Sequence, residues 1–142
     1  MTVFYGTQMA KFRSTVPPAL VDVADMGGKL RVFSETITLA TQTTADTIEV
    51  ARLPKGARVL YGVLVTTVIL GTSTVAIGIA GTTGKYRTAA TFTTADAPTL
   101  FGNTSVLGTA LAAEEIVFIT IGTASLPGSG TLRVMMVYAE NN

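Results

Sequence analysis

The feature that most constrains the fold of this chain is a succession of short segments with β-strand character, separated by turn residues at regular spacing. The segments are rich in valine, isoleucine and threonine, whose branched side chains suit a pleated surface better than a helix. The predicted strands are residues 30–40, 47–53, 58–70, 74–80, 86–94, 100–107, 114–121 and 132–138. Turns are predicted where proline and glycine cluster, at residues 54–56, 81–84 and 126–130. Short strands at this spacing predict an all-β, antiparallel sandwich or barrel.

The first 28 residues lack this pattern. Phe4, Tyr5 and Phe12 occur there without a clear period, and a pair of adjacent prolines interrupts any strand or helix. We therefore predict two parts, an extended N-terminal arm over residues 1–28 and a β-sandwich domain over residues 29–142. The arm is either a mobile tail or a segment that docks its aromatic side chains on a neighbouring subunit.

Several of the predicted strands are apolar on both faces, whereas a solvated antiparallel strand usually alternates between apolar and polar positions. In the last strand, Leu132, Val134, Met136 and Tyr138 form one face, and Arg133, Met135 and Val137 form the other. A two-sheet sandwich buries only one face of each sheet. We therefore predict that Met135 and Val137 take part in self-association. The alternative is that strongly bent sheets bury both faces within one molecule.

Composition supports the view that other protein covers part of the surface. Hydrophobic residues make up 48% of the chain and charged residues only 13%, against about 25% charged residues in typical soluble domains. The long uncharged stretches contain many threonines and glycines, so we expect no membrane segment. A net charge of +1 predicts no nucleic-acid partner. No secretory signal is visible at the N-terminus, so we expect the protein to stay where it is made or to leave the cell inside a larger assembly.

The chemistry of an enzyme is not visible in the sequence. Cysteine and histidine are absent, which removes the thiolate nucleophile, the usual proton shuttle and the commonest metal ligand. Residues 81–85 end in Gly-Lys, but a phosphate-binding loop needs glycine where Ile79 stands and serine or threonine where Tyr86 stands. Glu114 and Glu115 are adjacent on a strand and therefore point to opposite faces. We predict no enzyme activity, no cofactor and no metal site.

One stretch carries a resemblance to a known family. The segment Leu-Pro-Lys-Gly-Ala-Arg-Val-Leu at residues 53–60 is followed by a hydrophobic strand and then by Val-Ala-Ile-Gly-Ile-Ala-Gly at residues 75–81. This turn and layout, closed by a last strand over residues 130–138, resemble small capsid cement (decoration) proteins of tailed bacteriophages. The resemblance covers roughly residues 45–140, and no part of the arm matches. It implies a jelly-roll-like sandwich and homodimers or homotrimers on the outside of an icosahedral head.

The resemblance implies a virion protein on the capsid surface that binds the major capsid protein and clamps neighbouring subunits. We predict that Phe4, Tyr5, Phe12 and Arg13 of the arm bind the capsid, since buried aromatic and arginine side chains dominate interfaces. The alternative function is that of a glycan-binding jelly-roll module in a phage tail or fibre. Its aromatic platforms would be Tyr61, Tyr86 and Phe101.

Overall fold

The computed structural model describes residue 11 and residues 27–140. Its strands are β1 (Lys29–Thr38), β2 (Thr47–Leu53), β3 (Arg58–Thr66), β4 (Thr74–Ile79), β5 (Thr82–Thr91), β6 (Thr99–Phe101), β7 (Glu115–Gly122) and β8 (Thr131–Glu140). The predicted all-β class and all eight predicted strands are confirmed. Within the described part of the chain, no helix has the length and apolar character needed to cross a membrane.

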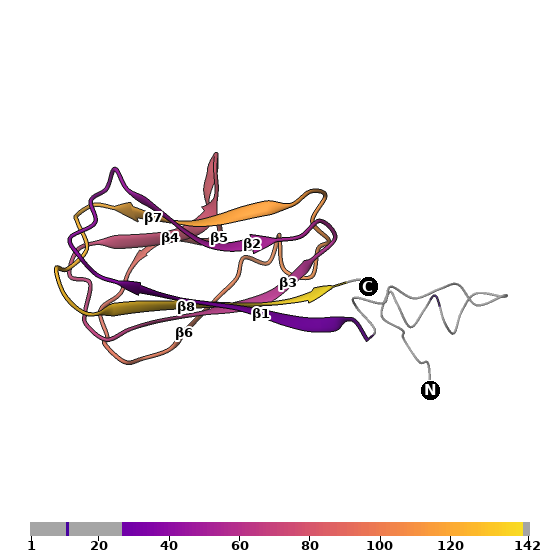
Figure 1. Cartoon of the computed structure of the whole chain (residues 1–142), viewed down its shortest axis with the longest axis horizontal. Coiled ribbons are helices and arrows are strands. Elements are labelled where there is room, and N and C mark those ends of the chain that lie inside the picture. Colours follow the sequence, from indigo (N-terminus) through magenta and orange to yellow (C-terminus); the bar gives the residue numbers. More distant parts are fainter. Residues whose placement is uncertain (1–10, 12–26, 141–142) are drawn as a thin grey trace, which may run out of the picture.

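The strands form two four-stranded sheets, β1-β8-β3-β6 and β2-β7-β4-β5, which lie over one another as two layers (Figure 1). Each strand of the first half pairs antiparallel with its counterpart from the second half: β1 with β8, β2 with β7, β3 with β6 and β4 with β5. The chain is thus one long hairpin, folded back between β4 and β5 and rolled so that successive pairs alternate between the sheets. This arrangement is a jelly roll, as the resemblance implied.

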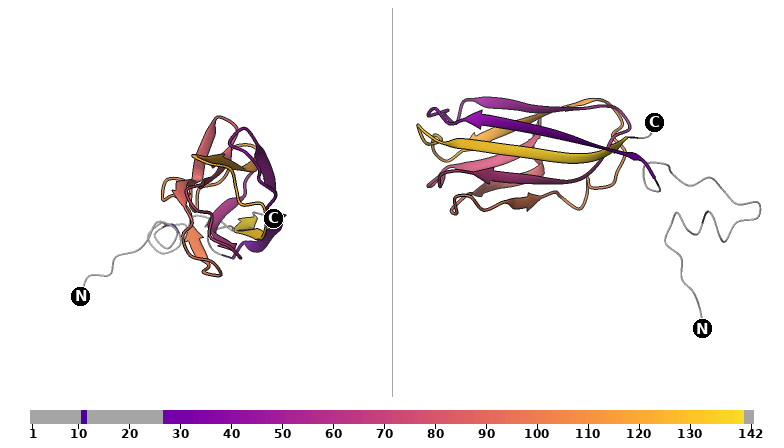
Figure 2. Two further views of the ribbon diagram at one scale, coloured as in Figure 1. Left: turned by 90° about the vertical axis from the view of Figure 1, so that its left-hand side faces the viewer. Right: turned by 60° about the horizontal axis from the view of Figure 1, so that its bottom comes forward.

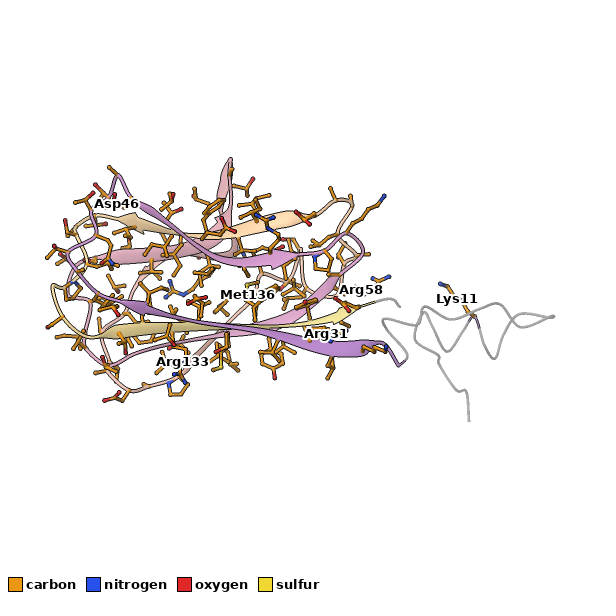
Figure 3. The ribbon with its side chains drawn as sticks, in the orientation of Figure 1. Lys11, Arg31, Asp46, Arg58, Arg133 and Met136 are labelled. Carbon is orange, nitrogen blue, oxygen red and sulfur yellow. The ribbon has the colours of Figure 1, made fainter. Side chains whose placement is uncertain are left out.

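The hydrophobic core lies between the two layers. In β8, Leu132, Val134 and Met136 are buried, and Figure 3 shows Met136 in the space between the sheets. From the other sheet, Val117 and Ile119 of β7 are also completely buried. Burying one such side chain stabilises the fold by roughly 1.5–3 kcal/mol. The face of each strand that carries most of these apolar side chains therefore points inward.

The predicted turn at residues 81–84 is wrong in its extent, because β5 already begins at Thr82. Gly81 reverses the chain with a φ of +81°, a conformation that glycine adopts without strain. The tight reversal presses the backbone of β5 against Gly78, where a Cβ would lie 2.2 Å from the carbonyl oxygen of Thr82. Strand pairing therefore starts directly after a single turn glycine.

Two predicted strands are shorter in the structure. The strand predicted over residues 58–70 ends at Thr66, whose hydroxyl donates to the carbonyl of Val68 at 2.8 Å and turns the chain. The strand predicted over residues 100–107 is reduced to Thr99–Phe101. Beyond it, the N–H of Val106 donates to the carbonyl of Asn103 at 2.9 Å, which closes a turn. Local hydrogen bonds ended both strands where hydrophobicity alone suggested continuation.

Candidate functional site

The most distinctive surface of the described chain is the outer side of the β1-β8-β3-β6 sheet, which the right-hand view of Figure 2 brings toward the reader. Residues directly opposite one another on paired strands point to the same side of a sheet. Because Val134 and Met136 of β8 point inward, their neighbours Met135 and Val137 point outward. The apolar side chains on this outer side include Leu30, Val32, Tyr61, Val63, Leu100, Met135 and Val137. We call these seven residues the apolar face.

The register of the strands makes the apolar face continuous. Val137 lies opposite Val32 of β1 on one side and opposite Tyr61 of β3 on the other. In the next row, Met135 lies opposite Val63, and Val63 in turn lies opposite Leu100 of β6. Neighbouring strands are about 4.8 Å apart, so side chains within each row are in contact range. The face therefore crosses all four strands.

The apolar face is exposed at its margins. Leu100 is 71% exposed, Leu30 64%, Val32 60% and Tyr61 44%. Met135 and Val137, at the centre, are half-buried by the side chains around them. Contiguous apolar patches beyond a few hundred Å² mark interaction surfaces, and covering about 400 Å² is worth roughly 10 kcal/mol before the costs of association. We identify this face as the candidate functional site.

Few polar groups interrupt the apolar face. Arg133 lies at its edge, on the side of β8 away from the core (Figure 3), and its Nε donates to the hydroxyl of Thr36 at 3.1 Å. At the opposite end of the same strand pair, on the inner side of the sheet, Arg31 forms an ion pair with Glu140 at 3.1 Å. These contacts, one near each end, tie β1 to β8.

An aromatic contact also joins β1 to β8 on the inner side. The rings of Phe33 and Tyr138 are stacked with their centroids 5.6 Å apart. Burial, with a smaller contribution from the charge of Glu140, raises the pKa of the Tyr138 hydroxyl, and the nearby guanidinium of Arg31 partly opposes this. The stack therefore fixes the position of β1, the outermost strand of the sheet.

A second polar cluster connects β5 to β7. The hydroxyl of the fully buried Tyr86 donates to Glu115 at 2.6 Å, and the ammonium group of Lys85 donates to the other oxygen of the same carboxylate. Burial, the hydrogen bond to Glu115 and its charge all raise the pKa of Tyr86. Asn103 adds hydrogen bonds to the carbonyls of Gly84 and Lys85, at 2.8 and 2.9 Å. Each of these groups is used to hold strands together, so we interpret the cluster as structural.

The structure places the other predicted site residues as follows. Of the three proposed glycan platforms, only Tyr61 is exposed; Tyr86 and Phe101 are buried in the core, so their prediction as platforms is wrong. Phe4, Tyr5, Phe12 and Arg13 lie outside the described residues. Within the described residues, no group of three or more histidine, cysteine, aspartate or glutamate side chains is placed to hold a metal ion.

Sequence reasoning found the centre of the apolar face but missed its margins. The two-faced pattern of residues 132–138 led directly to Met135 and Val137. Leu30, Val32 and Leu100 were missed because their strands showed no second apolar face. Only the pairing of β1 and β6 into this sheet brings those residues beside Met135 and Val137.

Comparison with known proteins gave matches among solved structures alone, since no protein-family model and no curated protein sequence matches. A chain of the cyanophage Pam1 capsid asymmetric unit is 28% identical, with a TM-score of 0.66 over 81% of this chain and 87% of that one. A chain of the Ralstonia phage GP4 capsid is 19% identical, with a TM-score of 0.65 over 83% and 88%. A chain of the acid-stable capsid of the Helicobacter pylori phage KHP30 is 11% identical, with a TM-score of 0.61 over 80% and 89%.

The last two likenesses show the fold alone, whereas the first extends to the sequence. In all three, the alignment covers similar shares of both chains, so each matched chain is about as short as this one. The likeness to phage capsid proteins that the sequence suggested is thus confirmed.

Proposed function

We propose that this chain is a structural protein of a phage particle, made in the host cytoplasm, that decorates the outside of the head and clamps neighbouring capsid subunits. The observation that carries the proposal is the recurrence of this jelly roll as a short chain in phage capsid structures, at 28% identity in one of them. The exposed apolar face supports it, because such a face needs a protein partner. A clamp also requires no reacting groups, so the structural use of Glu115 and Lys85 agrees with it.

We further propose that the apolar face binds the major capsid protein. Arg133 and Arg58 occupy the rows on either side of the two central rows of the face, and no carboxylate of the described residues lies in any of these rows. Two copies stacked face to face would therefore bring arginines together without an acidic partner. A capsid subunit that offers an apolar patch beside a carboxylate matches the face better, because complementary charge at the rim sets register and specificity.

In this proposal the N-terminal arm provides a second contact with the shell. Phe4, Tyr5, Phe12 and Arg13 remain predicted anchors, which would reach a capsid subunit other than the one beneath the apolar face. Two linked contacts strengthen one another, since binding of the first raises the effective concentration of the second. The clamp results from this bivalence, repeated over the shell.

The experiment mixes the purified protein with empty heads that lack it and compares Val137→Asp with wild type. Val137 lies between Val32 and Tyr61 in the middle of the apolar face. Burying an unpaired carboxylate there costs several kcal/mol, so we expect binding to heads to weaken by about 100-fold or more. The matched control is Thr47→Asp, on an exposed strand position of the other sheet, which should bind like wild type. Circular dichroism checks that both variants are folded.

Wild-type affinity of Val137→Asp for heads would refute the apolar face as the capsid contact. If the variant instead loses self-association and keeps its affinity for heads, Met135 and Val137 are self-association residues, as the sequence predicted. If the wild-type protein does not bind heads at all, the proposed function itself is wrong.

A further inference from the structure

The edges of the two sheets are not equally protected against pairing with another chain. A long, regular edge strand is a ready template for a further strand, and proteins usually shorten, bend or cover such edges. Here β6 has only three residues, β2 carries a bulge between Glu49 and Ala51, and β5 shows irregular register with β4. In contrast, β1 runs for ten residues in unbroken register with β8. No other described strand pairs with its outer side.

Hydrogen bonds show which backbone groups of β1 point to its outer side. The N–H of Leu39, just after β1, points toward β8, because it donates to the carbonyl of Gly130 at 2.9 Å. The N–H of Thr36 points the other way, because it meets the carboxylate of its own neighbour Glu35 at 3.2 Å. The carbonyl of Thr38 also points outward, to the amide of Gln42 at 2.9 Å. Since bonding direction alternates along an antiparallel strand, the outward groups of the remaining strand belong to Leu30, Val32 and Ser34.

We propose that β1 pairs antiparallel with β1 of a second copy, with Phe33 on the two-fold axis. In this register Val32 lies opposite Ser34 of the second copy and Leu30 lies opposite its Thr36, so outward-pointing backbone groups meet as hydrogen-bonded pairs. Arg31 of each copy, which also pairs with Glu140 of its own chain, then lies opposite Glu35 of the other. Opposite charges in directly facing positions stabilise strand pairing, and the two-fold axis makes the ion pair twice.

Other registers fit less well. If the two-fold axis passed between two residues, each residue with outward backbone groups would lie opposite a residue whose backbone groups point toward β8. The two strands could then form no regular ladder of hydrogen bonds. An axis at Ser34 would place Glu35 opposite Phe33 and lose both ion pairs. An axis at Val32 keeps a pair of opposite charges, Lys29 with Glu35, but leaves a shorter ladder. The register centred on Phe33 combines opposite charges with pairing along nearly the whole strand.

The surroundings of β1 have room for this partner. A hollow lined by Phe33, Glu35, Glu49, Val50, Ala51 and Arg52 opens between the edges of β1 and β2. The second copy's Phe33 would enter it, on the same side of the sheet as Arg31 and Glu35. Pairing would also join the apolar faces of the two copies at Leu30 and Val32, so that one continuous sheet carries both. This inference concerns the isolated protein and does not depend on binding to heads.

Disulfide trapping tests the register, because the chain has no cysteine of its own. In a facing pair without hydrogen bonds, the Cα atoms are about 4.5 Å apart, within reach of a disulfide. We therefore expect Phe33→Cys to form a covalent dimer under mild oxidation. Ser34→Cys is the matched control, since the axis at Phe33 places the two Ser34 residues diagonally, beyond about 7 Å. We expect at least about tenfold less dimer from it.

A second disulfide cross-linking experiment leaves Phe33 in place, so that its stack with Tyr138 is kept. Arg31→Cys and Glu35→Cys are purified separately and then mixed. The proposed register predicts a disulfide in the mixture and little in either protein alone. Equal cross-linking in the mixture and in the single proteins would overturn the inference. So would a wild-type protein that light scattering finds to be monomeric at ~100 μM, a concentration at which weak dimers form. Failure of the protein to bind heads would leave it intact.

Discussion

At the scale of single residues, the space around a side chain decides how strongly a substitution destabilises the fold. Gly62 of β3 lies under the ring of Phe101, and a Cβ at this position would lie 2.1 Å from the ring carbon Cζ. Gly62 and Phe101 pair directly across β3 and β6, and the buried ring of Phe101 fills the space that a side chain at position 62 would need. Gly62 therefore supports the short strand that contributes Leu100 to the apolar face.

We expect Gly62→Ala to lower the free energy of unfolding by about 2 kcal/mol, because overpacking a filled core forces side chains and backbone to shift. Denaturant unfolding followed by circular dichroism measures the change. Gly128→Ala is the control, since its added methyl group would meet only the methyl of exposed Thr41, at 3.2 Å. A variant of Gly62 as stable as the control would show that Phe101 moves freely.

The cluster of Tyr86, Glu115 and Lys85 makes a prediction about pH. The pKa of Tyr86 is raised in the folded state, so the folded protein binds this proton more tightly than the unfolded chain does. Stability from this group is thus complete below the unfolded pKa of about 10 and is lost as pH rises beyond it. Tyr138, whose pKa is also raised, adds to the same loss.

We expect Tyr86→Phe to lower the free energy of unfolding at pH 7 by about 1–3 kcal/mol, because it removes a hydrogen bond to a buried carboxylate. It should also reduce, but not abolish, the fall in stability above about pH 10, since Tyr138 still contributes. Urea unfolding at a series of pH values measures both effects. Tyr61→Phe, which changes an exposed hydroxyl, serves as the control at neutral pH. An unchanged alkaline slope in Tyr86→Phe would contradict the assignment.

At the scale of secondary-structure elements, the two sides of β1 have different roles. One side forms the ladder with β8, and the other offers backbone groups to a further strand. Proline distinguishes these sides, because it removes one N–H donor and is tolerated only where that donor faces solvent. Ser34 and Glu35 are adjacent residues whose N–H groups point to opposite sides.

We expect Ser34→Pro to leave the monomer folded, with a loss of about 1 kcal/mol or less, and to abolish dimerisation. Glu35→Pro removes a donor to β8 and should cost about 3 kcal/mol or more. Thermal unfolding and light scattering report on stability and mass. A fully dimeric Ser34→Pro variant would exclude the pairing of β1 with a second copy.

At the scale of the whole molecule, the jelly roll keeps its core, its apolar face and its free strand edge on separate surfaces. The core lies between the sheets, the apolar face covers the outside of one sheet, and the outer side of β1 is at right angles to that face. If both proposals hold, a molecule with this arrangement binds a copy of itself and a larger surface at the same time. This is the property that a clamp on a shell requires.

We expect heads reconstituted with the protein to keep their integrity at a temperature several degrees above that of heads without it, since a ligand that binds the assembled state stabilises it by mass action. Light scattering and electron microscopy after heating measure the loss of intact heads. Heads reconstituted with Val137→Asp should behave like bare heads. Equal heat resistance of bare and decorated heads would argue against the clamp.

The sequence alone determined the features that depend on a few neighbouring residues. Strand type and number followed from β-branched composition and turn glycines, and period-two alternation separated Met135 and Val137 from the buried positions Val134 and Met136. The alternation of neighbouring side chains between the two faces of a strand is a local property, so a single segment reveals it. The local pattern could not reveal which other strands would lie beside Met135 and Val137.

Only the tertiary structure decided which segments lie side by side. β1 and β8 pair although Lys29 and Glu140 are at opposite ends of the described chain. That pairing exposes Leu30 and Val32 beside Val137, while the packing of the two sheets buries Tyr86 and Phe101, which were expected on the surface. The physical reason is that burial depends on the free energy of long-range packing summed over both sheets. No single segment contains that information.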